Sequence, residues 1–127
     1  MRRWLFLGSL NGLAAVAAGA YGWHWLDPHE GFLDIFNLGV EYQMWHALAL
    51  LAVAWLASRA EERGGGGKAL DIAGWSFTAG IVLFSGTLYI YGHVGAVLVP
   101  LAAPLGGVLL LAGWAALMWA AIGEKAR

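Results

Sequence analysis

The chain has 127 residues, of which 61% are apolar and 12% are charged, with a net charge of −1 and a mean hydropathy of +0.68. Soluble domains are usually about 45–50% apolar and about 25% charged, so this composition excludes an ordinary soluble protein and indicates a membrane protein. The chain has no cysteine, which excludes disulfides and thiolate chemistry, and it lacks the basic stripe of a nucleic-acid-binding protein.

Four stretches without Asp, Glu, Lys or Arg indicate four spanning helices, because a span needs about 20 mostly apolar residues. We predict an all-α, four-transmembrane-helix bundle that forms a single domain, with helices at about 4–26, 36–58, 70–92 and 104–122. Pro100 and Pro104 interrupt the last stretch. We therefore expect an irregular connection over 93–103, with Pro104 in the first turn of the helix that follows.

The basic residues predict the orientation of the helices. With four spans, all seven Lys and Arg residues fall at the N-terminus, in the 58–71 loop or at the C-terminus. Because cytoplasmic loops are enriched in Lys and Arg, we expect a multi-pass protein of the bacterial inner (cytoplasmic) membrane with both termini cytoplasmic. The first span also resembles a secretory signal, but its length favours a retained helix. Tryptophans near helix ends are interpreted as interface anchors: Trp4, Trp23, Trp25, Trp75 and Trp119.

Small residues predict how the helices pack. In the first span they recur at spacings of three and four, on one helical stripe: Gly8, Gly12, Ala15, Gly19 and Gly22. Such a stripe lets another helix approach closely, so replacing Gly12 with Leu is expected to lower stability. Asn11 lies on the same side and is expected to bond to a neighbouring helix, and Gly106 and Gly107 are expected to pack the last span. Packing within the protomer is the preferred interpretation of the stripe, and a homodimer face is the alternative.

Polar side chains in the spans form a candidate cluster. Thr78, Ser85, Tyr89 and His93 are spaced seven, four and four residues apart, which makes one helical face directed at another helix. The run EYQMWH at 41–46 adds polar groups to the second span. The whole candidate cluster is His24, Glu41, Tyr42, Gln43, His46, Ser85, Tyr89 and His93.

Within EYQMWH, Glu41 and His46 are about 140° apart around a helix, so they do not form an acid–base pair. Glu41 is expected to reach headgroups or water. His46 is expected to be buried, neutral and hydrogen-bonded, with Ser85 as its partner.

The histidines do not predict a metal site. At 1.5 Å per residue, His46 lies more than about 10 Å deeper than His24 and His93, too far for ligand bonds of about 2 Å to one ion. A weaker set stays open, in which His24 and His93 combine with Glu41 and a loop residue, either His29 or Glu30. We predict no metal and no cofactor.

Four runs, one in each predicted span, carry a family resemblance: GLAAVAAGAYGWH (12–24), EYQMWHALALL (41–51), LFSGTLY (83–89) and PLGGVLLLAGW (104–114). They resemble the small inner-membrane proteins of domain-of-unknown-function family 423, which are related to the transmembrane protein 256 family. The resemblance covers essentially the whole chain. It implies a four-helix membrane protein without an established activity, cofactor or substrate.

We therefore expect a non-enzymatic role without catalytic residues, as a packing or interaction subunit or as a lipid-binding subunit. Membrane lipids are the expected partners, with a larger membrane complex or a homo-oligomer as further options and no nucleic acid. The alternative is a cofactor-bearing protein that holds haem, a metal or a quinone with the polar groups near the non-cytoplasmic side. A small transporter is disfavoured, because no charged residue lies near mid-membrane in any predicted span.

Overall fold

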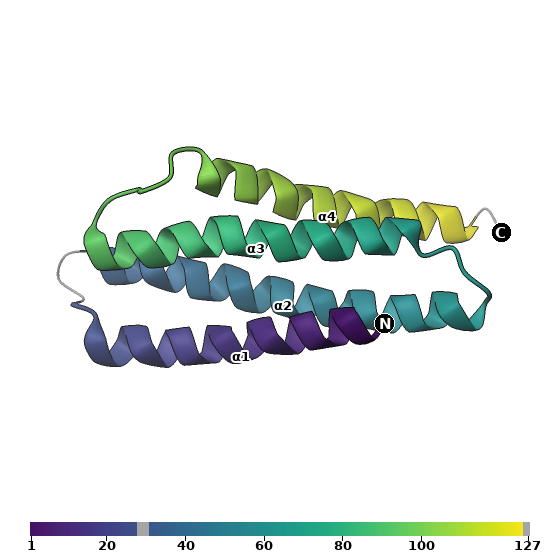
Figure 1. Cartoon of the computed structure of the whole chain (residues 1–127), viewed down its shortest axis with the longest axis horizontal. Helices are drawn as coiled ribbons and strands as arrows, with labels where there is room; N and C mark the ends of the chain where they lie inside the picture. Colours follow the sequence, from purple (N-terminus) through teal and green to yellow (C-terminus); the bar gives the residue numbers. More distant parts are fainter. Residues whose placement is uncertain (28–30, 126–127) are drawn as a thin grey trace.

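The computed structural model describes residues 1–27 and 31–125, and every regular element in these ranges is a helix (Figure 1). The helices are α1 (Arg2–Trp25), α2 (Phe32–Glu62), α3 (Lys68–Val94) and α4 (Ala102–Lys125). The all-α prediction is confirmed. Each helix extends past at least one predicted end, because the prediction stopped at charged residues and a helix can continue beyond them into water.

The connections between the helices follow from glycine and proline. Gly64, Gly65 and Gly66 all have positive φ, a conformation in which a Cβ would be strained, so α2 and α3 are joined by a turn suited to glycine. Pro104 is the third residue of α4, where a missing N–H costs no hydrogen bond. The irregular connection before it spans 95–101, which is shorter than expected.

Three of the described helices are long and apolar enough to cross a membrane: α1, α3 and the part of α4 up to Gly123. Their outward faces are apolar, with Leu13 69% and Leu111 70% exposed, as suits a surface that contacts lipid. The remaining helix, α2, has 31 residues but falls short in composition. It carries Gln43 and His46, which are buried inside the molecule.

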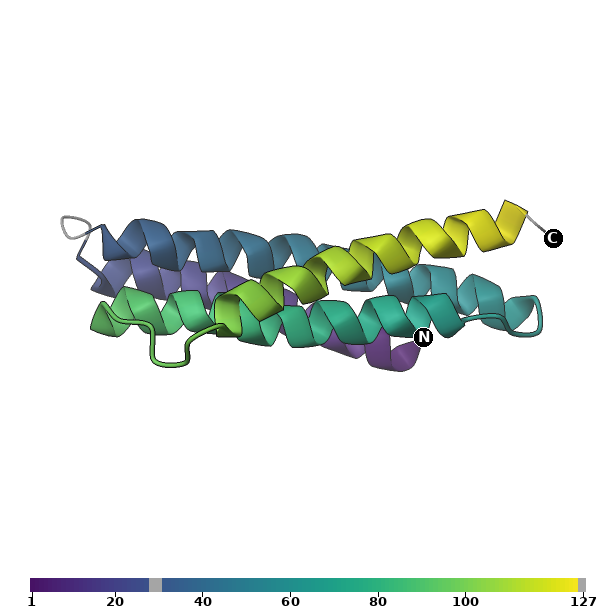
Figure 2. The same cartoon turned by 90° about the horizontal axis from the view of Figure 1, so that it is seen from above.

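The helices pack in chain order, with the main interfaces between α1 and α2, α2 and α3, and α3 and α4. The helices α1 and α4 therefore lie on opposite sides of the α2–α3 pair (Figure 1). The start of α1, the end of α4 and the 63–67 connection lie toward one end of the molecule. At the other end, α4 begins well short of the end of α3, and residues 95–101 run back along α3 to reach it (Figure 2).

The stripe of small residues on α1 packs on α2. Gly8 is buried, and a Cβ there would lie 2.9 Å from Leu51 Cδ2 and 3.1 Å from the Ala47 carbonyl oxygen. Gly22 meets the Phe36 ring in the same way, at 3.0 Å. Gly12 is the exception, because a Cβ there would have nothing within 4 Å. The close backbone packing at Gly12, on which the expected loss of stability in Gly12→Leu rested, is wrong, although α2 reaches the same turn of α1 through the bond between Gln43 and Asn11.

Two further stripe residues, Ala15 and Gly19, also face inward or toward α2. Ala15 is 0% exposed, and a Cβ on Gly19 would lie 3.5 Å from Val40 Cγ1, an ordinary contact. The stripe therefore packs within the protomer over most of its length.

The backbones of α3 and α4 meet at Gly106. A Cβ there would lie 2.5 Å from the Phe84 amide nitrogen and 3.0 Å from the Gly80 carbonyl oxygen, and both atoms belong to the α3 backbone. The next residue, Gly107, is much freer, with only Phe84 Cδ1 at 4.0 Å from its Cβ position. Of the two glycines expected to pack the last span, Gly106 sets the helix spacing, whereas Gly107 leaves space.

Trp4 lies in the core, which corrects its interpretation as an interface anchor. Its side chain is 0% exposed and fills the space over Gly74 of α3, where a Cβ would come within 2.6 Å of the ring. Its Nε1 is buried without a hydrogen-bond partner among the described residues. At the same end, an ion pair of 2.7 Å joins Arg3 to Asp71. The other four tryptophans interpreted as anchors are exposed: Trp23, Trp25, Trp75 and Trp119.

Candidate functional site

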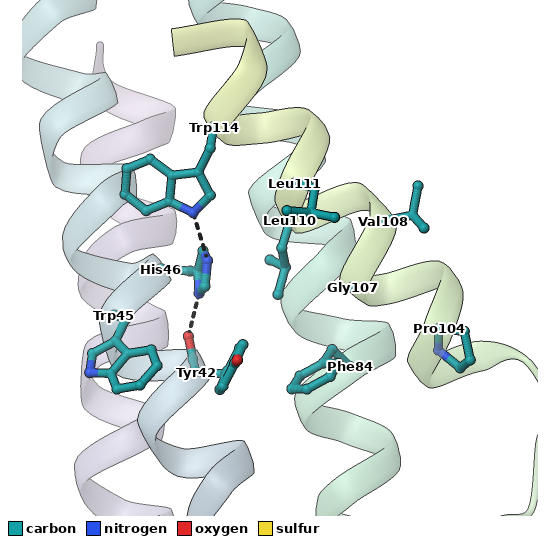
Figure 3. Close-up of a pocket in the computed structure, with 10 residues that line it drawn as sticks. All are labelled: Tyr42, Trp45, His46, Phe84, Pro104, Gly107, Val108, Leu110, Leu111 and Trp114. Atoms are coloured by element: carbon teal, nitrogen blue, oxygen red, sulfur yellow. Dashed lines mark hydrogen bonds between the residues drawn. The ribbon is translucent and has the colours of Figure 1, made fainter. Parts of the chain in front are cut away.

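An apolar groove lies between α2, α3 and α4 (Figure 3). Its volume of about 710 Å³ is within the range of roughly 300–1,000 Å³ that is usual for small-molecule sites. One wall is α2, with Tyr42, Trp45 and His46, and Phe84 of α3 forms the floor. The other wall is α4, with Pro104, Gly107, Val108, Leu110, Leu111 and Trp114.

The groove opens sideways, onto the apolar outer surface of the molecule. Its rim side chains are largely exposed: Trp45 by 52%, Val108 by 59% and Leu111 by 70%. Among the residues that the structure describes, no Asp, Glu, Lys or Arg lines it. The groove exists because α4 packs mainly on α3 and because Gly107 supplies no side chain to fill the space toward α2.

His46 forms part of the groove wall and uses both of its ring nitrogens. Nδ1 lies 2.7 Å from the carbonyl oxygen of Tyr42, and Nε2 lies 3.0 Å from Nε1 of Trp114 (Figure 3). A carbonyl only accepts and an indole N–H only donates, so Nδ1 carries the proton and Nε2 is the acceptor. The imidazole is therefore neutral, and neither nitrogen is free to bind a metal or haem.

The buried, hydrogen-bonded state expected for His46 is confirmed, since its side chain is 5% exposed. The expected partner, Ser85, is wrong. Ser85 instead donates to the Gly39 carbonyl oxygen of α2 at 2.7 Å. This bond requires α3 to lie close to the backbone of α2 at Gly39. A Cβ at Gly39 would lie only 3.3 Å from the Ser85 carbonyl oxygen, so glycine suits this position.

A second polar group, Gln43, connects three helices. Its side-chain nitrogen donates to Asn11 Oδ1 of α1 at 3.0 Å, and its side-chain oxygen accepts from the Tyr89 hydroxyl of α3. Asn11 then donates to the carbonyl oxygen of Leu7 at 2.9 Å. The expected bond from Asn11 to another helix is confirmed. Because every member has a partner, the network avoids the cost of unsatisfied polar groups in hydrocarbon.

His24, Glu41 and His93 of the candidate cluster make no contact with His46. The Nε2 atom of His93 is 2.7 Å from the Tyr21 hydroxyl, and the two rings stack with centroids 5.2 Å apart. His24 and Glu41 are exposed, and Thr78, which shares the polar face of α3, bonds to its own helix at the Gly74 carbonyl oxygen. The eight residues therefore belong to several separate groups.

A metal site would need three suitable side chains close together. No such group of His, Cys, Asp or Glu exists within residues 1–27 and 31–125. His29 and Glu30, which the weaker metal hypothesis used, lie outside the described residues.

Sequence reasoning missed the contribution of α4 to the groove. Gly107, Leu111 and Trp114 are four and three residues apart, so they share one face of a helix. This spacing, next to Pro104, was a signal in the sequence. It could not show which neighbouring helix that face meets, and so the bond from Trp114 to His46 was not expected.

Comparison with known proteins gives the family. The model of the family described as "Protein of unknown function (DUF423)" matches residues 18–107. The chain belongs to the DUF423 family. The match contains all of α2 and α3 and ends at Gly107, so it includes the groove residues of α2 and α3 and the start of the α4 wall.

Several curated proteins are similar over nearly their full length. UPF0382 membrane protein YwdK of Bacillus subtilis (strain 168) is 39% identical, covering 96% of this chain and 98% of its own length. A UPF0382 membrane protein of Haemophilus influenzae is 34% identical over 97% and 96%, and UPF0382 inner membrane protein YgdD of Escherichia coli (strain K12) is 33% identical over 95% and 90%. No solved structure matches the chain. The resemblance inferred from the four sequence runs is confirmed, and the protein is a membrane protein.

Proposed function

We propose that this DUF423 protein is a non-enzymatic, four-span protein of the inner membrane that binds the acyl chain of a membrane lipid in the groove between α2, α3 and α4. The groove is the observation that carries the proposal. It is apolar, of ligand size, and open toward the surface that hydrocarbon would cover.

The position of α2 supports its role as the fourth span. It packs between α1 and α3, and both of these are apolar enough to cross a membrane. A helix held between two spanning helices has to lie at the same depth. Its polar residues Gln43 and His46 bond to other helices, so their polar atoms are satisfied within the bundle, and the lower apolar content of α2 fits a helix that packs between two others.

The distribution of charge supports an orientation with both termini in the cytoplasm. All Lys and Arg residues lie in the sequence near the two chain termini or between residues 59 and 68, and the start of α1, the end of α4 and the turn from α2 to α3 lie toward one end of the molecule. Basic residues favour the cytoplasmic side.

The chemistry of the groove supports lipid binding over catalysis or cofactor binding. Its imidazole, His46, is neutral and has both nitrogens bonded. A haem or metal would have to break the bond with Trp114 to use Nε2. An acyl chain would need no polar partner and would cover the exposed rim formed by Trp45 and Leu111.

A photoreactive lipid tests this proposal. Phosphatidylglycerol with a diazirine near the middle of one acyl chain would be incorporated into vesicles that contain the full-length protein, and the cross-linked peptides would be mapped. We expect cross-links concentrated in residues 42–46 and 104–114. Gly107→Leu should reduce them several-fold, because the new side chain enters the groove, where a Cβ at Gly107 has only one atom, at 4.0 Å.

Gly12→Leu is the matched control. It makes the same chemical change at a helical position that also has an open Cβ environment, but on α1 and outside the groove. It should leave the cross-links unchanged. Cross-links spread evenly over the four helices, or equal labelling of Gly107→Leu, would contradict lipid binding in the groove.

A further inference from the structure

We propose that the groove selects an ester-linked glycerolipid from the non-cytoplasmic leaflet, with the Tyr42 hydroxyl donating a hydrogen bond to an ester carbonyl. This inference rests on the proposed function and specifies its ligand. Three observations carry it: the missing hydrogen-bond partner of the Tyr42 hydroxyl among the described residues, the depth of Tyr42 in the membrane, and the extent of the groove.

The ring of Tyr42 is fixed in the groove wall, with Phe84 at 4.6 Å and Trp45 at 5.0 Å between ring centroids. Its backbone carbonyl accepts the His46 proton, so both the backbone and the ring are held in place. The hydroxyl is different. It has no hydrogen-bond partner in the part of the chain that the structure describes, and it is not enclosed by protein.

A phenolic hydroxyl that faces hydrocarbon without a partner carries a free-energy cost. Tyr89 shows the contrast, because its hydroxyl is bonded to Gln43 within the bundle. A ligand that brings an acceptor to Tyr42 would remove the cost. Because the rest of the groove is apolar, one acceptor joined to a long apolar chain is the complementary ligand.

The depth of Tyr42 places this acceptor at the edge of the hydrocarbon. Tyr42 precedes Arg59 by 17 residues, which is about 26 Å of helix at 1.5 Å per residue, and the hydrocarbon core is about 30 Å thick. The neighbouring residue Glu41 is exposed, and its carboxylate requires headgroups or water nearby. Ester carbonyls of glycerolipids lie at this boundary, just outside the acyl chains.

The groove extends from this boundary to the middle of the membrane. Pro104 lines its outer end, and Trp114 lines its inner end. Trp114 precedes Lys125 by 11 residues, about 17 Å, which is close to the midplane of a ~30 Å core. The groove therefore lies within one leaflet. By the same count Tyr42 and Trp114 differ in depth by about 9 Å, and the imidazole of His46 bridges them, so an acyl chain that starts at Tyr42 would pass Trp114 and continue past the groove.

The test compares two lipids that differ only in the carbonyl. Delipidated full-length protein would be titrated with dioleoyl phosphatidylglycerol and with its dioleyl ether analogue, and binding would be measured by native mass spectrometry. Interhelical hydrogen bonds in membranes average about 0.6 kcal/mol with a maximum near 1.7 kcal/mol, so we expect the ester lipid to bind about 3-fold to about 18-fold more tightly.

Tyr42→Phe should abolish this preference by weakening the ester lipid alone. Tyr91→Phe is the matched control, because the Tyr91 ring contacts Phe32 and does not line the groove, and it should keep the preference. Equal binding of both lipids to the unmodified protein, with both lost in Gly107→Leu, would overturn this inference and leave the proposed function standing.

Two other outcomes would also overturn the inference. Unchanged binding of both lipids to Gly107→Leu would remove the proposed function together with it. A short-chain quinone that displaces the ester lipid from the unmodified protein, and binds more weakly to Tyr42→Phe, would assign the Tyr42 hydroxyl to a quinone carbonyl instead.

Discussion

His46 is a polar side chain that the fold makes compatible with a membrane. Its Nδ1–H donates to the backbone one turn earlier, and its Nε2 accepts from Trp114 on another helix. A charged imidazolium would be expensive at this depth, whereas the neutral ring uses its one donor and its one acceptor. The bond to Trp114 also ties α2 to α4, two helices that otherwise have little contact.

A double-mutant cycle tests this bond. His46→Leu and Trp114→Phe should each lower stability, and their effects should be non-additive by about 0.6 kcal/mol, with an upper limit near 1.7 kcal/mol. The measurement is reversible unfolding of the protein in mixed micelles.

Trp119→Phe provides the control for the cycle. Trp119 lies on the same helix and is 55% exposed, so its substitution should combine additively with His46→Leu. If the coupling between His46 and Trp114 were also zero, the bond would contribute nothing to the fold.

At the scale of the helices, contact between backbones determines where a side chain is tolerated. The helices α3 and α4 meet through Gly80 and Gly106, each with a carbonyl oxygen 3.0 Å from the Cβ position of the other. Because these oxygens belong to the backbone, the rotation of a side chain cannot make room for a Cβ at either glycine. On α1, Gly12 belongs to the same kind of glycine pattern but has no neighbour within 4 Å of its Cβ position.

Gly106→Ala and Gly12→Ala should therefore have opposite effects. The first forces α3 and α4 apart and should cost about 1–3 kcal/mol, as overpacking does. The second removes the flexibility of a glycine from a helix and should be neutral or stabilise by up to about 1 kcal/mol. Thermal denaturation in detergent, followed by circular dichroism, compares the two variants directly, and a loss of stability in Gly12→Ala equal to that in Gly106→Ala would contradict the assigned interfaces.

For the whole molecule, the ends of the helices suggest its position in the membrane. One end carries the terminal amine, which is paired with Glu61 at 3.0 Å, and the Arg3–Asp71 pair at 2.7 Å. These ion pairs join α1 to α2 and to α3 where charge can meet water. The opposite end carries exposed aromatic residues such as Trp23 and Trp25, which suit a membrane interface.

Reporter fusions test the proposed orientation. A fluorescent protein that matures only in the cytoplasm should be active when fused at Gly65 and after Arg127, because these positions lie in the basic connection and at the basic C-terminus. Alkaline phosphatase, which is active only outside the cytoplasm, should be active when fused near Glu30. Cytoplasmic fluorescence from a fusion near Glu30 would contradict the four-span topology.

The sequence alone determined the helical class, the approximate position of each helix and the membrane environment. These follow from local composition, because an apolar stretch of about 20 residues has few ways to satisfy its backbone in lipid other than as a helix. The identity of several interface residues also followed from spacing, as for Gly8 and Gly22 on α1. Asn11 was correctly expected to bond to another helix, because a buried amide requires a partner.

The tertiary structure alone decided which helix each face meets, and so it decided the site. Local spacing gives the direction of a side chain around its own helix, but it does not give the offset of one helix along another. Because α4 starts well inside the end of α3, Trp114 reaches His46 while Ser85 turns to Gly39. Trp4 became a core residue for the same reason, since Gly74 of α3 lies opposite it. Gly12 stayed open because no atom of a neighbouring helix lies within 4 Å of its Cβ position.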